Sequence, residues 1–230
     1  WHTLSLHDAL PILREDKIAV IRNFVDRDRF FRPDLRAPTR RALGIPADAT
    51  VVLNVGRLVP EKAQSDFLQV AARCLPANEK LHFLLVGDGP LHDDLAGEAS
   101  ALGLPGTGRF HMLPFDPQIE RMYVAGDILL HTAHREALAN VLLEAMAAGL
   151  PIVATDVGGA REVVEAADNR TFVFPVHDVH AAADFVLEVN ANQDGRGGGA
   201  EPQRPLEERF GRATHVRLFR ELLRNAMDGE

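Results

Sequence analysis

Short apolar runs alternate along the chain with longer segments in which apolar residues recur at helical spacing. Val51-Val52-Leu53-Asn54-Val55 and Phe83-Leu84-Leu85-Val86 are typical runs, with almost no polar interruption. Strands of this kind belong to a parallel sheet that has helices on both faces. The strand–helix–strand order indicates right-handed crossover units. The pattern therefore predicts an α/β fold, a doubly wound parallel sheet in a single Rossmann-like domain.

The predicted strands are residues 17–21, 50–55, 81–86, 109–113, 127–131, 151–155 and 171–174. The predicted helices between them are residues 63–74, 91–102, 118–125, 139–148, 160–166 and 179–189. Doubly wound sheets bind their ligands at the carboxyl ends of the strands. We therefore expect the chemistry of this protein in the loops that follow the strands.

Residues 190–205 break this alternation, with four glycines, two prolines and almost no apolar side chain. We interpret them as a flexible loop. Apolar residues then return at helical spacing, which predicts an amphipathic helix over residues 206–230. Residues 17–189 form the predicted α/β domain, and residues 1–16 are interpreted as a linker or a non-native segment.

Composition narrows the class of protein. Hydrophobic residues make up 46% of the 230 residues and charged residues 25%, which excludes a disordered chain. The 25 Lys and Arg against 33 Asp and Glu give a net charge of −8, which argues against binding to a nucleic acid backbone. Cys74 is the only cysteine, which excludes an internal disulfide and a multi-cysteine metal site. No apolar run approaches the roughly 18 residues of a transmembrane helix.

The first candidate site is the segment Gly56-Arg57-Leu58-Val59-Pro60-Glu61-Lys62, which directly follows a predicted strand. Gly56 permits a sharp turn, and the next helix is expected to start near Ala63. A helix start offers free backbone N–H groups, and Arg57 and Lys62 add positive charge on the same loop. This combination suits a diphosphate group, although two surface cations on an ordinary loop give the same pattern.

Two glycine turns follow other predicted strands. Gly87-Asp88-Gly89-Pro90-Leu91 resembles the start of a dinucleotide-binding Gly-x-Gly-x-x-Gly loop, but His92 stands where the third glycine belongs. This segment is either a simple turn or one that lets the backbone approach a ligand. Gly158 and Gly159 end another strand and also allow close approach of a ligand or of the backbone.

A pair of glutamates, Glu136 and Glu144, flanks the start of a predicted helix. Glu136 lies in the loop after a strand, and Glu144 follows the apolar run Val141-Leu142-Leu143, which places it on a largely buried helix. A buried carboxylate needs partners, because an unpaired charge there costs several kcal/mol. Two sugar hydroxyls would satisfy it, although glutamates at this spacing are common on helices.

In their order along the chain, these motifs resemble the C-terminal, donor-binding half of a GT-B glycosyltransferase, in the retaining group called family 4. Residues 17–33 (KIAVIRNFVDRDRFFRP) resemble the segment that carries Asn-Gly-Val-Asp in the family, and residues 56–62 resemble its Gly-Arg-Leu…Lys phosphate loop. Residues 87–91 resemble its Gly-Asp-Gly-Pro-Leu turn, residues 136–144 its Glu-x7-Glu element, and residues 149–159 the segment that follows.

The resemblance implies a hexosyltransferase-type enzyme that transfers the sugar of a nucleotide-diphosphate sugar, with retention. Arg57 and Lys62 would hold the diphosphate and stabilise the charge on the leaving nucleotide. Glu136 would lie near hydroxyls of the transferred sugar, so these three are the implied catalytic residues. The implied binding groups are the backbone of Leu138 and Ala139 facing the phosphates, Glu144 on the ribose hydroxyls, and the glycines Gly56 and Gly87.

The sequence departs from the family in the donor loops. Ala63, Ala137 and Ala139 stand where the family usually has glycine. At positions 137 and 139, alanine is tolerable only if φ is not positive and the added methyl group clears the ligand.

The resemblance also implies transfer without a bound metal or other cofactor. Asp26-Arg27-Asp28 has the Asp-x-Asp form of a metal–diphosphate site, but it lies in the segment that resembles a linker in the family, so we reject a metal role. The pairs His131/His134 and His177/His180 have no obvious third ligand nearby in the sequence.

The family's acceptor site lies largely in an N-terminal GT-B domain, and Trp1 to Ile12 match nothing in the family. We therefore expect the chain to be about half an enzyme, with the missing N-terminal domain as its partner. Acidic charge and the lack of a secretory pattern predict a cytoplasmic protein. Peripheral contact with the inner membrane surface is expected if the acceptor is a lipid-linked sugar.

Two other functions remain open. One is a GT-B nucleotide-sugar epimerase, which the ordered set of cations and glutamates disfavours. The other is a non-catalytic nucleotide-binding or interaction module, which the alanines at positions 137 and 139 favour.

Overall fold

The computed structural model describes residues 20–166, 171–192 and 204–228. Residues 1–16, interpreted above as a linker or a non-native segment, lie outside the described residues, as do residues 193–203 of the predicted loop. The described residues 190–192 at the start of that loop lie within or just after a helix, and Arg204 begins another.

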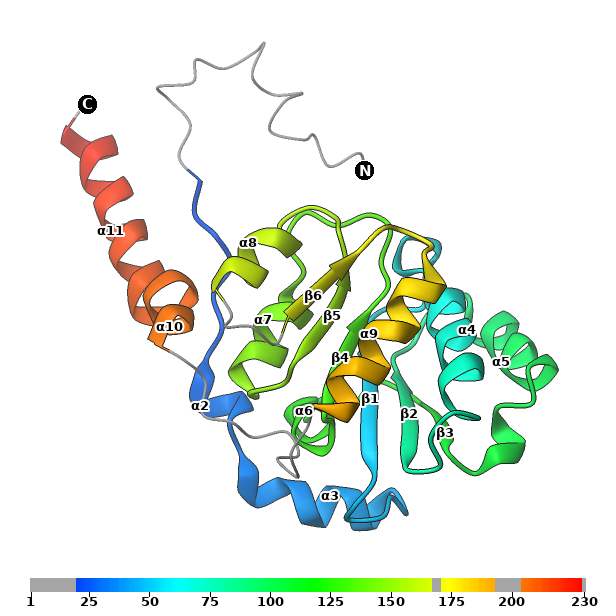
Figure 1. The fold of residues 1–230 in the computed structure, drawn as a ribbon. Helices are drawn as coiled ribbons and strands as arrows, with labels where there is room; N and C mark the ends of the chain where they lie inside the picture. The colour runs from blue at the N-terminus through cyan, green and yellow to red at the C-terminus, as the bar shows by residue number, and fades with distance from the viewer. Residues whose placement is uncertain (1–19, 167–170, 193–203, 229–230) are drawn as a thin grey trace.

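The core of the fold is one sheet of six parallel strands in the order β3-β2-β1-β4-β5-β6 (Figure 1). The strands are β1 (Thr50–Val55), β2 (Leu81–Val86), β3 (Phe110–Leu113), β4 (Ile128–His131), β5 (Ile152–Thr155) and β6 (Thr171–Phe174). All six coincide within one residue with predicted strands, which confirms the doubly wound, Rossmann-like fold. The strand order reverses between β1 and β4, so the loops after these two strands diverge around a crevice at the carboxyl edge.

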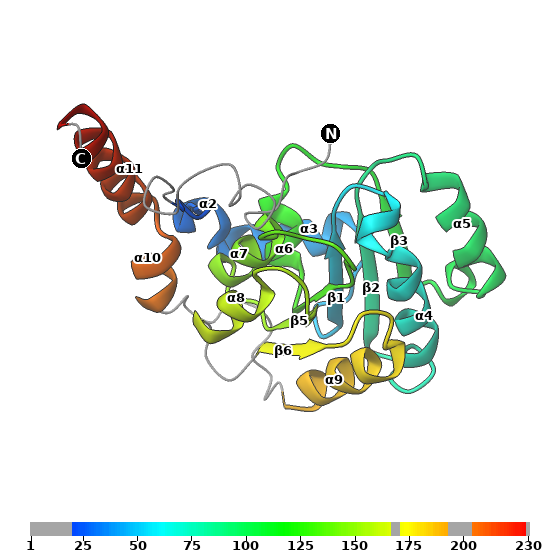
Figure 2. The ribbon, with the colours of Figure 1, turned by 90° about the horizontal axis from the view of Figure 1, so that it is seen from above.

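Helices cover both faces of the sheet (Figure 2). On one face lie α4 (Gln64–Cys74), α5 (His92–Ala101) and α9 (Val179–Ala191). On the other lie α2 (Arg27–Phe30), α6 (Glu120–Ala125), α7 (Asn140–Ala147), α8 (Ala160–Ala166) and α10 (Arg204–Phe210). Alternate residues of β1 face the two layers, because Val51 and Leu53 pack in the second layer and Val52 in the first.

A helix that the sequence pattern did not predict, α3 (Arg36–Ala42), lies at the amino edge of the sheet. Arg36 and Arg40 of α3 both form ion pairs with Asp127, which directly precedes β4. The same carboxylate accepts a hydrogen bond from the Val51 backbone N–H at 2.7 Å. This buried network fixes α3 to β1 and β4 at the edge opposite the crevice.

The strand predicted at residues 17–21 does not form in its described part. Residues 20–23 have no regular secondary structure, and the side chain of Val20 is 58% exposed. An apolar run becomes a strand only where a neighbouring edge accepts its hydrogen bonds, and none of the described strands pairs with residues 20–23. Only Val25 makes a single bridge in this part of the chain, with Gly211.

The terminal segment forms two helices, α10 and α11 (Arg212–Asp228), where the pattern predicts one. The carbonyl of Phe210 accepts the Val25 backbone N–H at 3.0 Å and is thereby taken from the helical ladder. A Cβ at Gly211 would overlap the Glu207 carbonyl oxygen, so this tight junction requires glycine.

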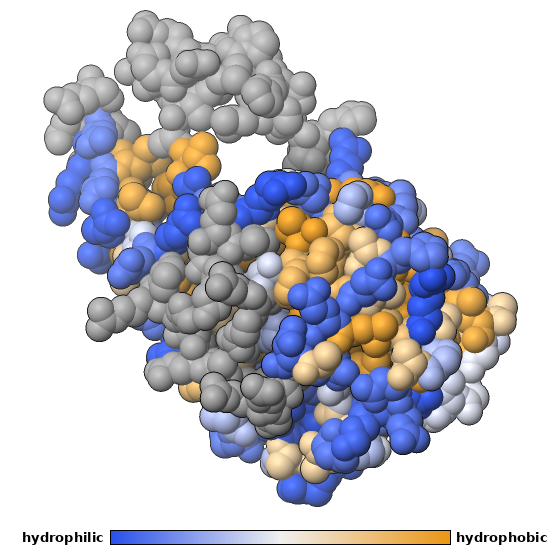
Figure 3. Space-filling view, viewed as in Figure 1, coloured by the Kyte–Doolittle hydropathy of each residue, from blue (hydrophilic) through white to orange (hydrophobic). Residues whose placement is uncertain are grey.

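Helix α11 projects from the body of the molecule in both ribbon views (Figures 1 and 2). Apolar side chains gather on it in the space-filling view (Figure 3). The exposed ones are Val216, Leu218, Phe219, Leu222, Leu223 and Met227. Across the part of the chain that the structure describes, no helix combines the length and the apolar character needed to cross a bilayer.

Candidate functional site

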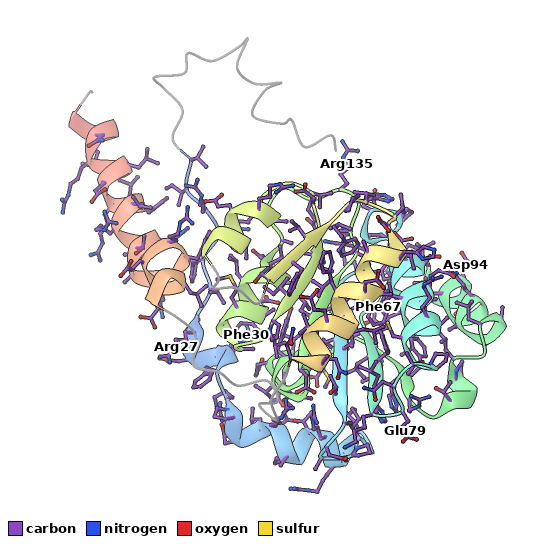
Figure 4. The ribbon with its side chains drawn as sticks, viewed as in Figure 1. Arg27, Phe30, Phe67, Glu79, Asp94 and Arg135 are labelled. Atoms are coloured by element: carbon purple, nitrogen blue, oxygen red, sulfur yellow. The ribbon has the colours of Figure 1, made fainter. Side chains whose placement is uncertain are left out.

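Most of the predicted site residues lie in the loops after β1 and β4, at the point where the strand order reverses. Gly87 instead follows β2, and Glu144 lies within α7. In Figure 4, Arg135 marks the loop after β4 at the carboxyl edge, and Glu79 marks the opposite edge. The first loop carries Arg57 and Lys62, and the second carries Glu136. The fold thus brings together the phosphate-loop candidate with Arg57 and Lys62 and the segment that carries Glu136.

Lys62 and Glu136 form an ion pair across the two loops. Their side chains are 22% and 16% exposed, so the pair is largely buried but open on one side. Burial lowers the pKa of Lys62, and the nearby charge of Arg57 lowers it further. Arg57 itself is exposed. The charges of Arg57 and of Glu61 both act on Lys62, in opposite directions, and Lys62 is paired with Glu136.

Three hydrogen bonds hold the loops in register. Thr132 Oγ1 donates to the Lys62 carbonyl at 3.1 Å, and the His134 backbone N–H donates to the Glu61 carbonyl at 3.0 Å. Buried Asn54 on β1 donates to the Leu130 carbonyl at 2.8 Å. The geometry of the Lys62–Glu136 pair is therefore set by backbone positions rather than by two free side chains.

His131, the last residue of β4, lies beneath this pair. Its Nε2 atom is 3.9 Å from Glu136 Oε1 and, among the described residues, has no hydrogen-bond partner. Burial lowers the pKa of His131 to about 3, and the charge of Lys62 acts in the same direction. His131 is thus a neutral ring at physiological pH, next to a charged pair.

The glycines of the second turn are explained by backbone packing. Gly87 has φ of +153°, and a Cβ there would overlap the carbonyl oxygen of Gly56. A Cβ at Gly89 would likewise overlap the carbonyl oxygen of Leu58, whose N–H donates to the Asp88 carbonyl at 2.9 Å. The turn therefore supports the loop that carries Arg57 and Lys62.

Gly158 and Gly159 support the second loop in the same way. A Cβ at Gly158 would overlap the carbonyl oxygens of Glu136 and Ala137. The Gly159 N–H donates to the Ala137 carbonyl at 2.6 Å. Both glycine turns thus press against the loops that carry the charged residues.

The alanines that replace the family's usual glycines differ in conformation. Ala139 is extended, with φ of −76°, and Ala137 has no positive φ either. Ala63, by contrast, has φ of +47° and ψ of 45°, the left-handed region that alanine rarely adopts. The backbone strain at the site is therefore at the end of the Lys62 loop.

Helix α7 begins with Ala139 as its N-terminal cap, and no side chain caps it. The N–H groups in the first turn of a helix have no intrahelical acceptor. Leu138 and Ala139, predicted to face the phosphates, therefore lie where free N–H groups and the positive end of the helix dipole meet.

Glu144 lies one turn further along α7 and is half-buried. Its Oε2 atom accepts a hydrogen bond from the hydroxyl of Tyr123 on α6 at 2.6 Å. No described contact joins it to Lys62 or Glu136. Tyr123, the only tyrosine of the chain, lies in a predicted helix, but no sequence motif singles it out.

The Asp-x-Asp segment serves a structural purpose, because Asp26 caps α2 by accepting the Asp28 backbone N–H at 3.2 Å. Within residues 20–166, 171–192 and 204–228, no three His, Cys, Asp or Glu side chains cluster in a way that could hold a metal ion. Metal-independent transfer stays a prediction.

Comparison with known proteins adds to this geometry. Residues 36–213 match the family of glycosyl transferases group 1. The D-inositol 3-phosphate glycosyltransferase of Saccharomonospora viridis is 31% identical, over 97% of this chain and 53% of that protein. The enzyme of the same name from Streptomyces avermitilis is 35% identical, over 73% of this chain and 38% of that protein. The chain thus spans about half the length of the curated relatives it matches.

Solved structures share the fold. HepE of Anabaena in complex with UDP and glucose superimposes with a TM-score of 0.77 and 26% identity, over 91% of this chain and 57% of that chain. A glycosyltransferase of Rickettsia africae has a TM-score of 0.83 at 19% identity, over 97% of this chain and 62% of that chain. With the family match over residues 36–213, this chain belongs to the group 1 glycosyl transferases, and its fold is that of the C-terminal domain of a GT-B glycosyltransferase.

Proposed function

We propose that this domain binds the nucleotide-diphosphate sugar donor of a retaining, hexosyltransferase-type glycosyltransferase. The observation that carries the proposal is the Lys62–Glu136 pair beside Arg57, at the reversal of strand order. Open α/β sheets bind ligands at such a point. HepE of Anabaena, which shares the fold, has been solved in complex with UDP-glucose.

In this proposal, Arg57 and Lys62 hold the diphosphate. Charge develops on the leaving nucleotide during transfer, so cations fixed in a partly buried site lower the barrier most at that position. Lys62 then turns from Glu136 toward the phosphate, which frees the carboxylate for hydroxyls of the sugar. We also propose that these cations let transfer proceed without a bound metal.

The remaining predicted groups surround the same donor. The N–H groups near Leu138 and Ala139 face the phosphates at the start of α7, and Glu144 binds the ribose hydroxyls. Gly56 and Gly87 keep the phosphate loop close to the sheet through backbone packing.

The acceptor site is proposed to lie in an N-terminal domain that this chain does not include. The curated relatives are about twice as long as the region they share with it. We therefore expect purified chain to bind nucleotide and to transfer no sugar. The cytoplasmic location and the peripheral membrane contact stay predictions from the sequence.

Calorimetric titration of the chain with UDP, GDP and ADP tests the proposal. At least one is expected to bind, and Lys62→Met should weaken it by about 10- to 100-fold, as expected for loss of a charge-assisted hydrogen bond. Lys80→Met is the matched control, because Lys80 pairs with Asp48 in an exposed position near the amino edge. A folded chain that binds none of the three nucleotides would contradict the proposal.

A further inference from the structure

Tyr123 makes a short hydrogen bond to one oxygen of Glu144. The distance from its hydroxyl to Glu144 Oε2 is 2.6 Å, within the range of an O–H donor to an ionised carboxylate. Burial raises the pKa of Tyr123 far above its usual value, so the hydroxyl keeps its proton and donates it. The bond therefore has one direction, from Tyr123 to Glu144.

Tyr123 is held rigidly from its other side. Its side chain is fully buried, and its ring makes an edge-to-face contact with Phe30 of α2 at 5.4 Å between centroids. Phe30 is itself buried and is labelled on α2 in Figure 4. A ring packed in this way cannot follow the carboxylate if Glu144 changes rotamer. Tyr123 thus selects one orientation of Glu144.

The second oxygen of Glu144 has no partner among the described residues, since only Oε2 is hydrogen-bonded. Burial raises the pKa of Glu144, while the Tyr123 hydrogen bond and the charge of Arg29 oppose this effect. Arg29 forms its ion pair with Glu120 instead, at 3.2 Å. The Oε2 atom of Glu144 is therefore occupied by the Tyr123 hydrogen bond, and its Oε1 atom is free to accept a hydrogen bond from a ligand.

We propose that Tyr123 is a positioning residue that fixes Glu144 so that its Oε1 atom accepts a hydrogen bond from a ribose hydroxyl. The consequence is selectivity for ribonucleotides over 2′-deoxyribonucleotides. This inference rests on the proposed donor site, and it adds a residue and a selectivity that the donor site alone does not require. A purely structural tyrosine would stabilise the core without altering that selectivity.

The test is the ratio of the dissociation constants for 2′-deoxy-UDP and UDP, measured by calorimetry on the full chain. If GDP or ADP is the nucleotide that binds, its own 2′-deoxy form is used. The wild-type chain should favour the ribonucleotide by at least about tenfold, and Tyr123→Phe should reduce the ratio below about threefold. Glu144→Ala should remove the preference, and adding Tyr123→Phe to it should change nothing further.

Met122→Leu, a buried change on the same helix, controls for lost packing and should leave the ratio at its wild-type value. A pH series gives a second readout. The Tyr123 hydrogen bond lowers the pKa of Glu144, so as the pH falls, the residual preference of Tyr123→Phe should be lost at a higher pH than the preference of the wild type.

Each failure has a distinct result. An unchanged ratio in Tyr123→Phe, with the ratio lost in Glu144→Ala, would overturn the role of Tyr123 alone. An unchanged ratio in Glu144→Ala would overturn the ribose assignment and the inference with it. If the wild type binds no nucleotide, the donor-site proposal fails first.

Discussion

Lys62 and Glu136 are 74 positions apart in the sequence, and their side chains form an ion pair where the strand order of the sheet reverses. Lys62 ends a short 3-10 turn after β1, and Glu136 lies in the loop after β4. Because backbone hydrogen bonds hold both loops, the pair can open toward a ligand without the loops moving apart.

Glu136→Gln should strengthen the binding of nucleotide diphosphates. The substitution removes a negative charge close to the diphosphate and releases Lys62 from its ion pair. Repulsion between one partly buried carboxylate and a bound diphosphate costs roughly 1 kcal/mol of binding free energy. Its removal should therefore raise the affinity for UDP at pH 7 about fivefold. Calorimetric titration measures the change.

Glu61→Gln is the control for this charge effect. Glu61 is exposed and raises the pKa of Lys62 only through space, so its removal should alter the affinity much less. Weaker binding of UDP by Glu136→Gln than by the wild type would show that Glu136 positions Lys62 rather than competing for it.

Ala63→Gly should stabilise the fold by about 0.5 kcal/mol. Alanine at φ of +47° carries a strain of roughly 1–2 kcal/mol, which glycine removes. The added entropy of the unfolded chain offsets part of this gain, by about 0.4–1 kcal/mol. Urea denaturation gives the free energy of unfolding.

The opposite sign is expected for Ala137→Gly. Ala137 has no positive φ, so glycine relieves no strain there and only makes the unfolded chain more flexible. A loss of about 0.4–1 kcal/mol is expected. If both substitutions destabilise the protein equally, the left-handed conformation of Ala63 is not a source of strain.

The sequence was sufficient for the sheet and for the identity of its charged loops. Runs such as residues 83–86 are apolar on both faces, as expected of a strand between two helical layers. The same reasoning failed for residues 20–21, where an apolar run found no neighbouring strand to accept its hydrogen bonds. Hydrophobic periodicity indicates which side chains of a segment can be buried, whereas strand pairing also requires a neighbouring strand from elsewhere in the chain.

The hydrophobic pattern could not predict contacts between residues far apart in the sequence. The hydrogen bond between Tyr123 and Glu144 joins two helices, and nothing in the sequence around either residue indicates the other as its partner. The left-handed Ala63 and the helix α3 were hidden for related reasons, because tertiary contacts override the local preference of each residue. The glycines, in contrast, marked places of close backbone approach, and Gly87 against Gly56 is one of them.

Asp127→Asn should destabilise the fold by about 3–5 kcal/mol. The carboxylate is buried and pairs with both Arg36 and Arg40, so its neutralisation leaves the buried Arg40 and the partly buried Arg36 without a counter-charge. Burial already lowers the pKa of Arg40, which shows how poorly that guanidinium is solvated. Urea denaturation at pH 7 measures the loss.

Asp48→Asn serves as the comparison. Asp48 pairs with Lys80 at 2.9 Å, but both side chains are exposed, and such pairs contribute at most about 1 kcal/mol to the free energy of unfolding.

The UDP affinity of the folded Asp127→Asn chain should match that of the wild type, because the Arg36–Arg40–Asp127 network lies at the edge of the sheet opposite the proposed donor site. A loss below about 1 kcal/mol in Asp127→Asn would mean that water reaches the two arginines.

His131 should make the fold sensitive to acid. Its pKa is lowered to about 3 in the folded chain, whereas an exposed histidine has a pKa near 6.5, so the unfolded state binds more protons between these values. The contribution of His131 to stability is complete above pH 6.5 and is lost progressively as the pH falls toward 3. At pH 5 the loss from this residue is about 2 kcal/mol.

Urea denaturation at pH 7.5 and pH 5 tests this, with His131→Leu compared with the wild type. The wild type should lose about 2 kcal/mol more than the variant between the two pH values, because leucine has no proton to bind. His92→Gln, a change at an exposed position, should leave the wild-type difference unchanged. Equal losses in the wild type and His131→Leu would show that His131 is protonated in the folded chain at pH 5, and that Lys62 and Glu136 accommodate the added charge.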